Sequence, residues 1–338
     1  IHCGLLGSLT TMLIAMPGWH RRPHIVSDPH PVYKAGREIP RPVAGLVTQK
    51  GSAMSHSEDL MNVAALATLV REGRCRPVDC RFDLFDADKG RRDFEAGHIP
   101  GAVYADMDRD LAGPVTAETG RHPLPDVNQF RHRLSAWGIG DDTLVVAYDN
   151  GNGSLASRLW WMLRCWLGHE RVALLDGGIA AWTEAGEGLS TDPAEPTLAS
   201  YTRHPDHEVI ATTAEIAALV SSGEAWCLVD ARDPARFRGE YEPIDPVAGH
   251  IPGARNMPLT LNLTPDGRWR KPPELGEIWR EHLAAAGERR PVVMCGSGVT
   301  ACHLALAARQ AGLPTPRLYV GSWSEWVRDP GRPVAVAT

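Results

Sequence analysis

The residues best suited to chemistry lie in one short loop, which reads Cys-Gly-Ser-Gly-Val-Thr at positions 295–300. Gly296 and Gly298 let successive backbone N–H groups point inward without obstruction by side chains, which forms an anion-binding nest. A helix that begins near Val299 directs the positive end of its dipole at the same point. Both effects stabilise a thiolate or persulfide anion. The loop therefore predicts that Cys295 is a nucleophile rather than a structural thiol.

The remaining cysteines suggest neither a metal site nor a disulfide framework. The chain has seven cysteines, an odd number, and no Cys-x-x-Cys motif. We therefore expect no metal and no organic cofactor, and a reducing cytosol is the simplest compartment. Structural roles on strand or helix faces are expected for Cys75, Cys80, Cys165, Cys227 and Cys302.

Two rival chemistries for a cysteine loop are disfavoured. Cysteine phosphatases follow their Cys with five residues and then an Arg, whose guanidinium holds the phosphoryl oxygens. Here Ala301 occupies the position of that Arg. The chain also has no GxxxxGK[ST] phosphate-binding loop. A phosphatase or an arsenate reductase is therefore a poor fit.

The chain repeats itself, which shows how such a loop is positioned. Four segments recur in the same order at a nearly constant offset: 78–81 matches 229–232, 97–102 matches 249–254, 146–149 matches 292–295, and 174–178 matches 318–322. A period this long indicates a duplicated domain.

The two copies serve as controls for each other. Features present in both are interpreted as turn and salt-bridge elements, namely His98 with His250 and Arg81 with Arg232. The copies differ at the end of one predicted strand, where the first has Asp149 and the second has Cys295. Only the second copy therefore carries a nucleophile there.

Each copy alternates predicted strands and helices. Apolar runs at Thr143–Tyr148 and Pro291–Met294 suit buried strands, and helical patterns follow at Leu155–Leu167 and Val299–Ala311. Another helical pattern spans Leu60–Val70. This order predicts an α/β fold of two tandem domains, each a mainly parallel sheet with helices on both faces. The cleft between the domains is the expected place for a site.

Amino-acid composition also predicts a linker between the two domains and an extension before the first. A segment rich in Pro, Gly, Ser and Thr at Gly188–Pro205 predicts a linker. Residues 1–53 lack any sustained periodicity, and we interpret them as a disordered or mis-started extension, with a targeting segment or a folded arm as alternatives. The predicted units are the extension 1–53, an inactive first domain 54–187, the linker 188–205 and a catalytic domain 206–338.

The charge balance narrows the range of partners. The formal net charge is −6, which argues against nucleic acid or an anionic membrane surface. No stretch approaches the roughly 18 apolar residues that span a bilayer. A small anion in a local basic pocket remains compatible with this balance.

The tandem GHIPGA turns and the sequence CGSGVTA at Cys295–Ala301 resemble those of the two-domain rhodanese family. The loop is similar to that of the 3-mercaptopyruvate sulfurtransferases within it, and the resemblance covers roughly Met54 to Pro330. Thiosulfate-preferring relatives usually carry a basic residue in this loop, which this chain lacks. The resemblance implies two rhodanese-like domains, the second of them catalytic.

The resemblance also assigns site residues. It implies that Cys295 becomes a persulfide and that Ser297, His122 and Asp108 move protons, the last two reaching the loop from the first domain. The residues implied to bind the substrate are Arg236, for its carboxylate, and the loop positions Gly296, Gly298, Val299 and Thr300.

One position departs from the family pattern. Mercaptopyruvate enzymes commonly carry a second Arg in a Glu-Pro-Arg sequence, whereas this chain reads Glu-Pro-Ile and ends on Ile244. A second carboxylate clamp is then either missing or supplied elsewhere, for example by Arg238 or Arg255. The identity of the sulfur donor is the property that this departure leaves open.

The expected activity is transfer of sulfane sulfur from 3-mercaptopyruvate to cyanide, a small thiol or a thioredoxin-like protein through a Cys295 persulfide. The alternatives are thiosulfate as donor by the same mechanism, and a sulfur-carrier module that does not turn over. A monomer or a weak dimer is expected.

Overall fold

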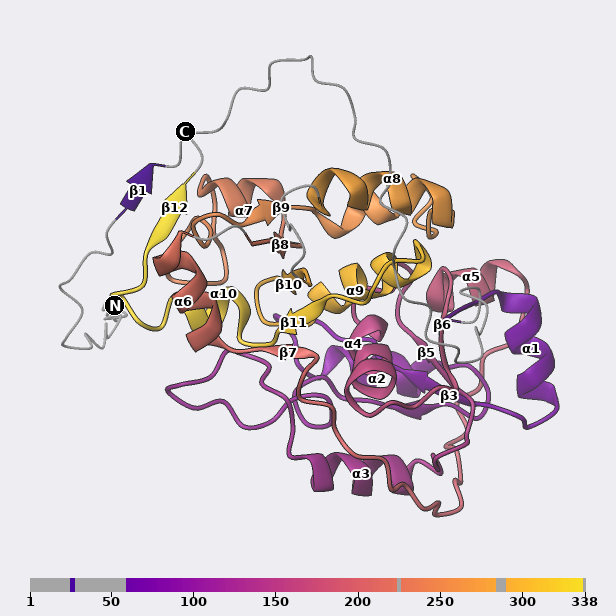
Figure 1. Cartoon of the computed structure of the whole chain (residues 1–338). Coiled ribbons are helices and arrows are strands. Elements are labelled where there is room, and N and C mark those ends of the chain that lie inside the picture. The colour runs from indigo at the N-terminus through magenta and orange to yellow at the C-terminus, as the bar shows by residue number, and fades with distance from the viewer. Residues whose placement is uncertain (1–24, 28–58, 224–225, 284–289, 337–338) are drawn as a thin grey trace, which may run out of the picture.

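The computed structural model describes residues 25–27, 59–223, 226–283 and 290–336. Its framework is a pair of five-stranded parallel sheets, one in each half of the chain (Figure 1). The strand order is β2-β6-β5-β3-β4 in the first sheet and β7-β11-β10-β8-β9 in the second. When the strands are counted along each half, the two orders are the same. The predicted α/β fold of two similar halves is therefore confirmed.

The first sheet contains β2 (Leu60–Met61), β3 (Arg76–Asp79), β4 (Val103–Tyr104), β5 (Val145–Tyr148) and β6 (Val172–Leu175). The second contains β7 (Ile210–Ala211), β8 (Leu228–Asp230), β9 (Arg255–Asn256), β10 (Val292–Met294) and β11 (Arg317–Tyr319). A separate parallel pair joins β1 (Ile25–Ser27) to β12 (Val334–Val336). The expectation for the rest of residues 1–53 lies outside the described residues.

Helices cover both sheets (Figure 1). Those of the first half are α1 (Val63–Arg71), α2 (Lys89–Ala96), α3 (Val127–Ala136), α4 (Ala156–Trp161), the π-helix η2 (Met162–Trp166) and α5 (Gly178–Glu184). Those of the second are α6 (Thr213–Ser222), α7 (Pro234–Arg238), the 3₁₀-helix η3 (Leu259–Asn262), α8 (Pro272–Leu283), α9 (Ala301–Gln310) and α10 (Ser322–Trp326). Among the described residues, no helix combines the length and the apolar character needed to cross a bilayer.

The strands that lead to the loops of interest lie inside their sheets. Strand β5 pairs with β3 and β6, and strand β10 pairs with β8 and β11. All residues of both strands are buried, as their continuous apolar runs predict for a sheet covered on both faces. Each strand therefore fixes the position of the loop that follows its carboxyl end.

Three element boundaries differ from the sequence prediction. Leu60 and Met61 do not begin a helix but form the edge strand β2, and Asn62 caps α1 by accepting a hydrogen bond from the Ala65 N–H. The helix expected over Leu155–Leu167 is divided into α4 and η2. The helix after the Cys295 loop begins at Ala301 rather than near Val299.

The repeated arginines have the structural role that their recurrence suggests. Arg81 pairs with Asp79 at 2.7 Å and donates to the Gly97 carbonyl at 2.8 Å. Arg232 pairs with Asp230 at 2.8 Å in the same way. In each half the pair fixes the end of a strand to the turn that precedes the GHIPGA histidine.

The repeated histidines are also structural. His98 stacks on Phe94 with 3.9 Å between ring centroids, and His250 stacks on Phe237 at the same separation. Each imidazole Nδ1 lies 2.8 Å from the backbone carbonyl of the phenylalanine on which it stacks.

The two halves share one core. Helices α4 and α9, which follow the matching strands β5 and β10, pack against each other. Leu159 and Trp160 of α4 belong to the same buried cluster as Leu304 and Ala305 of α9. Burial of this apolar surface holds the halves together, so residues contributed by both can form a single site.

Candidate active site

Cys295 lies at the carboxyl end of β10 and is almost fully buried, with 2 % of its surface exposed. Its Sγ accepts a hydrogen bond of 3.1 Å from the Gly298 N–H. The loop ends where α9 begins at Ala301. The sulfur therefore lies beside a backbone amide of the loop, close to the positive end of the α9 dipole.

Helix α10 holds this loop in place. The Cys295 N–H donates to the Ser322 Oγ at 3.2 Å, and the Trp323 N–H donates to the Cys295 carbonyl at 3.0 Å. Ser322 has a φ of 52°, a left-handed conformation that costs free energy in a residue other than glycine. Gly298 has a φ of 77°, and a Cβ there would lie 2.4 Å from the Val320 carbonyl oxygen. This position thus requires glycine.

A hydrogen-bonded chain reaches the loop from the first half. His122 Nδ1 lies 2.7 Å from the Ser297 Oγ, and His122 Nε2 lies 3.2 Å from an Asp108 carboxylate oxygen. Because a carboxylate only accepts, Nε2 donates to Asp108, while Nδ1 and the Ser297 hydroxyl share the second hydrogen bond. His122 is buried, whereas the Asp108 side chain is 48 % exposed. The structure thus brings together three of the predicted site residues.

Arg236, on α7, lies beside the loop and is held by acidic side chains. Its Nη2 pairs with Glu242 at 2.8 Å and with Asp245 at 3.4 Å. Asp245 also pairs with Arg121, which immediately precedes His122 in the chain. The network therefore joins an arginine from each half through one buried carboxylate.

These groups surround a cavity of about 210 Å³. Its wall includes Cys295, His122 and both arginines, together with the apolar side chains of Phe82, Leu84, Leu155 and Ile244. Ile244 therefore contributes an apolar surface where the family pattern has a basic one. Arg238 pairs with Glu240, Arg255 donates to the Glu281 carbonyl, and neither lines this cavity.

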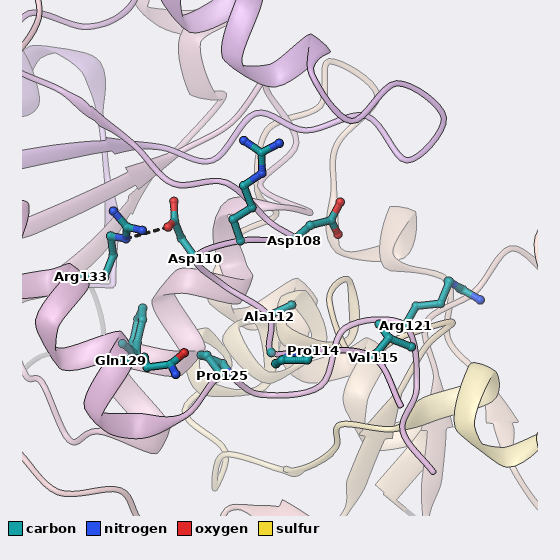
Figure 2. Close-up of a pocket in the computed structure, with 12 residues that line it drawn as sticks. Asp108, Asp110, Ala112, Pro114, Val115, Arg121, Pro125, Gln129 and Arg133 are labelled. Atoms are coloured by element: carbon teal, nitrogen blue, oxygen red, sulfur yellow. Dashed lines mark ion pairs between the residues drawn. The ribbon is translucent and has the colours of Figure 1, made fainter. Parts of the chain in front are cut away.

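A second cavity of about 410 Å³ lies on the other side of Asp108. Figure 2 shows Asp108 on its wall, together with the ion pair between Asp110 and Arg133. Arg121 lines both cavities, and in Figure 2 its side chain extends away from that ion pair. Asp108 thus connects the buried His122 to an open, polar space.

The sequence analysis did not assign a role to Arg158, a fully buried residue of α4. Its guanidinium donates to the backbone carbonyls of Gly298 at 3.0 Å, His122 at 3.1 Å and Leu111 at 3.3 Å. Burial lowers the pKa of this group. Arg158 thus binds the histidine segment of one half to the cysteine loop of the other. An arginine followed directly by Leu159, Trp160 and Trp161 was the available signal.

The matching loop of the first half has a carboxylate in place of the cysteine. The Asp149 carboxylate accepts hydrogen bonds from four backbone amides, those of Gly151, Gly153, Leu155 and Ala156, at 2.9–3.2 Å. In this copy the loop therefore binds an anion that is part of the chain.

The other described cysteines differ from Cys295 in their surroundings. All of them are unpaired. Burial raises the pKa of Cys75 and Cys227 to about 11 and that of Cys165 to about 12, and it also raises the pKa of Cys80 and Cys302. These five are therefore neutral thiols at pH 7. In the described part of the chain, no three His, Cys, Asp or Glu residues are grouped so as to hold a metal ion.

Comparison with known proteins gives consistent matches. The family model described as "Rhodanese-like domain" matches residues 62–185 and again 212–329. A Pseudomonas aeruginosa protein named "Probable 3-mercaptopyruvate sulfurtransferase" is 46 % identical over 281 residues, which are 82 % of this chain and 98 % of that protein. The thiosulfate sulfurtransferase of Cricetulus griseus is 34 % identical over 278 residues, covering 79 % of this chain and 91 % of that protein. The solved structure of 3-mercaptopyruvate sulfurtransferase from Leishmania major superposes with a TM-score of 0.70 at 31 % identity, over 80 % of this chain and 74 % of that one.

Proposed function

The chain belongs to the rhodanese family, and from that premise we propose that it transfers a sulfur atom from 3-mercaptopyruvate to an acceptor through a persulfide on Cys295. The observation that carries this proposal is the position of the Cys295 sulfur. The sulfur accepts a hydrogen bond from the Gly298 amide and lies on the wall of a cavity that is also lined by two arginines, Ser297 and His122, with Asp108 hydrogen-bonded behind His122. A small anionic sulfur compound fits the charge and the size of this cavity.

In the first step, the Cys295 thiolate attacks the sulfur atom of the donor. An S–S bond forms while the C–S bond of mercaptopyruvate breaks, and the electron pair of the broken bond leaves with the enolate of pyruvate. The product on the protein is a persulfide whose charge lies among the backbone amides of the loop, including that of Gly298. The step requires no metal and no organic cofactor.

The proton of the donor thiol must reach the carbon of the departing enolate. Ser297 and His122 are hydrogen-bonded at 2.7 Å, and His122 in turn contacts Asp108. We assign the proton transfer to these hydrogen-bonded residues, because a hydroxyl that is hydrogen-bonded to an imidazole can both accept and return a proton. Asp108 orients the imidazole and lies at the open second cavity, where protons can exchange with solvent.

In the second step, an acceptor takes the outer sulfur. The nucleophile is cyanide in an assay, or the thiolate of a small thiol or of a thioredoxin-like protein. It bonds to the outer sulfur, the S–S bond of the persulfide breaks, and Cys295 leaves as a thiolate. The protein returns to its starting state, as expected of two-step transfer.

The experiment that tests the proposal is steady-state sulfur transfer to cyanide, with kcat/KM measured for 3-mercaptopyruvate and for thiosulfate. We expect a preference of about a hundredfold or more for mercaptopyruvate, which corresponds to about 2.7 kcal/mol or more of differential transition-state binding. No transfer from either donor, with intact folding, would contradict the proposal.

A thiosulfate sulfurtransferase is the second candidate. Ile244 supports it, because this residue lines the cavity where a second arginine for a carboxylate is common. The likeness to the thiosulfate sulfurtransferase of Cricetulus griseus also supports it. A higher kcat/KM for thiosulfate would establish this alternative, and persulfide loading without repeated turnover would favour a sulfur carrier.

A further inference from the structure

Two guanidinium groups approach the cysteine loop from opposite halves of the molecule. A Cβ placed on Gly296 would lie 2.9 Å from Nη2 of Arg121, 3.7 Å from Nη2 of Arg236 and 3.9 Å from its Nη1. Gly296 directly follows Cys295. Nitrogen atoms of both arginines therefore lie within 4 Å of one point beside the nucleophile.

Both arginines keep donors that no group in the described part of the chain uses. Nη1 of Arg121 pairs with Asp245, while the buried Nε of Arg121 has no hydrogen-bond partner among the described residues. Nε of Arg236 donates to Glu242, and Nη2 of Arg236 donates to Glu242 and Asp245. Within the described residues we find no hydrogen bond from Nη2 of Arg121 or from Nη1 of Arg236. Unused guanidinium donors beside a cavity are suited to a ligand with several acceptor oxygens.

The acidic residues position these arginines without blocking them. Asp245 binds both guanidinium groups, so it fixes the distance between an arginine of the first half and one of the second. Both arginines line the cavity that Cys295 also lines. Arg238, the other arginine of α7, pairs with Glu240 and does not line it.

We infer that Arg121 and Arg236 together bind the carboxylate of the sulfur donor, with Arg121 providing the second clamp. This inference rests on the proposed function and names the residue that replaces the missing arginine at Ile244. One oxygen of the carboxylate accepts from Arg121 and the other from Arg236, beside Gly296. Because Gly296 directly follows Cys295, a three-carbon donor held there has its sulfur close to the Cys295 side chain.

The test compares Arg121→Gln and Arg236→Gln with the wild type and with the matched control Arg238→Gln, an exposed arginine of the same helix as Arg236. KM and kcat are measured for 3-mercaptopyruvate, and the inhibition constant is measured for pyruvate, which has the carboxylate but no sulfur. Loss of one charged hydrogen bond should raise both KM and the inhibition constant about ten- to hundredfold in the two clamp variants. The kcat should change much less, because the contact is the same in ground and transition states. Arg238→Gln should match the wild type, and a KM and inhibition constant of Arg121→Gln within twofold of wild type would overturn the inference.

A second variant separates binding from structure. Arg121→Gln also removes a partner of Asp245, whose unpaired carboxylate could itself disturb the cavity. In Arg121→Gln with Asp245→Asn, that charge is absent. We expect the double variant to stay impaired, and recovery of the wild-type KM would show that Arg121 has only a structural role.

The carboxylate clamp can still be tested if the proposed function is wrong. A wild type that does not transfer sulfur from mercaptopyruvate would contradict that function alone. Calorimetric binding of pyruvate to the wild type, lost in Arg121→Gln, would still support the carboxylate clamp. Equal pyruvate binding by both proteins, or none by either, would refute it.

Discussion

The imidazole of His122 lies 2.7 Å from the hydroxyl of Ser297, although 175 positions separate these residues in the chain. His122 belongs to the first half of the molecule and Ser297 to the cysteine loop of the second. The first half has Asp149 where the second has Cys295, yet it contacts the loop of the second half directly. This contact explains why the first half cannot be regarded as an inert duplicate.

Replacement of the nucleophile should abolish transfer. Cys295→Ser keeps the size of the side chain and a polar atom for the Gly298 N–H, so the fold should be preserved by circular dichroism and thermal melting. Sulfur transfer to cyanide should fall below about a hundredth of the wild-type rate, as for other removed nucleophiles. Cys75→Ser is the control, since burial raises the pKa of Cys75 to about 11, and it should retain full activity. Substantial turnover by Cys295→Ser would end the assignment.

The effect of replacing His122 on kcat should depend on the sulfur donor. His122→Asn keeps a group that can hydrogen-bond Ser297 but cannot exchange a proton at neutral pH. With mercaptopyruvate, kcat should fall about a hundredfold or more, in the range for general acid–base groups. With thiosulfate, whose leaving sulfite needs no proton, the loss should be below about tenfold. Equal losses with both donors would show that His122 acts on the loop rather than on the proton.

Removal of Arg158 should destabilise the joint between the halves. Arg158→Met fills similar volume but removes the Arg158 donor from the carbonyls of His122 and Leu111, and it leaves the Gly298 carbonyl with only the weak Cys302 thiol donor. Each buried, unpaired carbonyl costs about 1–3 kcal/mol, so urea unfolding should show a loss of about 2 kcal/mol or more. Arg74→Met, which removes an exposed partner of the exposed Glu72, should cost less than about 1 kcal/mol. Similar stabilities for the two variants would contradict this account.

Stability should fall in acid because of His303. Burial lowers the pKa of His303 from its ordinary value of 6.5 to about 3. The imidazole Nε2 lies 3.1 Å from the Asn152 carbonyl, and the ring stacks on Trp269. Below pH 6.5 the His303 imidazole is protonated in the unfolded chain but stays neutral in the folded one. The free energy of unfolding therefore decreases as pH falls from 6.5 towards 3. The slope from this one group approaches about 1.4 kcal/mol per pH unit.

Urea titrations of the wild type and of His303→Gln at pH 7 and pH 5 measure this slope. The variant should be less stable at pH 7 but should lose less stability between the two values. His132→Gln, an exposed position on α3, should keep the wild-type slope. A His303→Gln slope as steep as that of the wild type would mean that other groups cause the acid sensitivity.

Local pattern and internal repetition were enough to predict most of the framework. The buried apolar runs that became β5 and β10 define their own strands, and the repeat gave the same fold twice. Leu60 and Met61 were misassigned because a two-residue edge strand has no periodicity of its own, and only its pairing with β6 defines it.

The site was predictable only in part, for a related reason. Cys295 and its glycines carry their chemistry within six consecutive residues. The resemblance to a family was needed to connect His122 and Asp108 to that loop. Arg121 and Arg158 acquire their positions from contacts between the halves, and no spacing along one chain segment reports such contacts.

The carboxylate of Asp149, bound by four amides of the first loop, acts there as a permanently tethered ligand. A group attached to the strand that ends in its own binding site is present there at a high effective concentration. A dissolved donor therefore competes poorly with this carboxylate. Titration with a sulfur donor should saturate at one equivalent per chain, although the fold contains the loop twice.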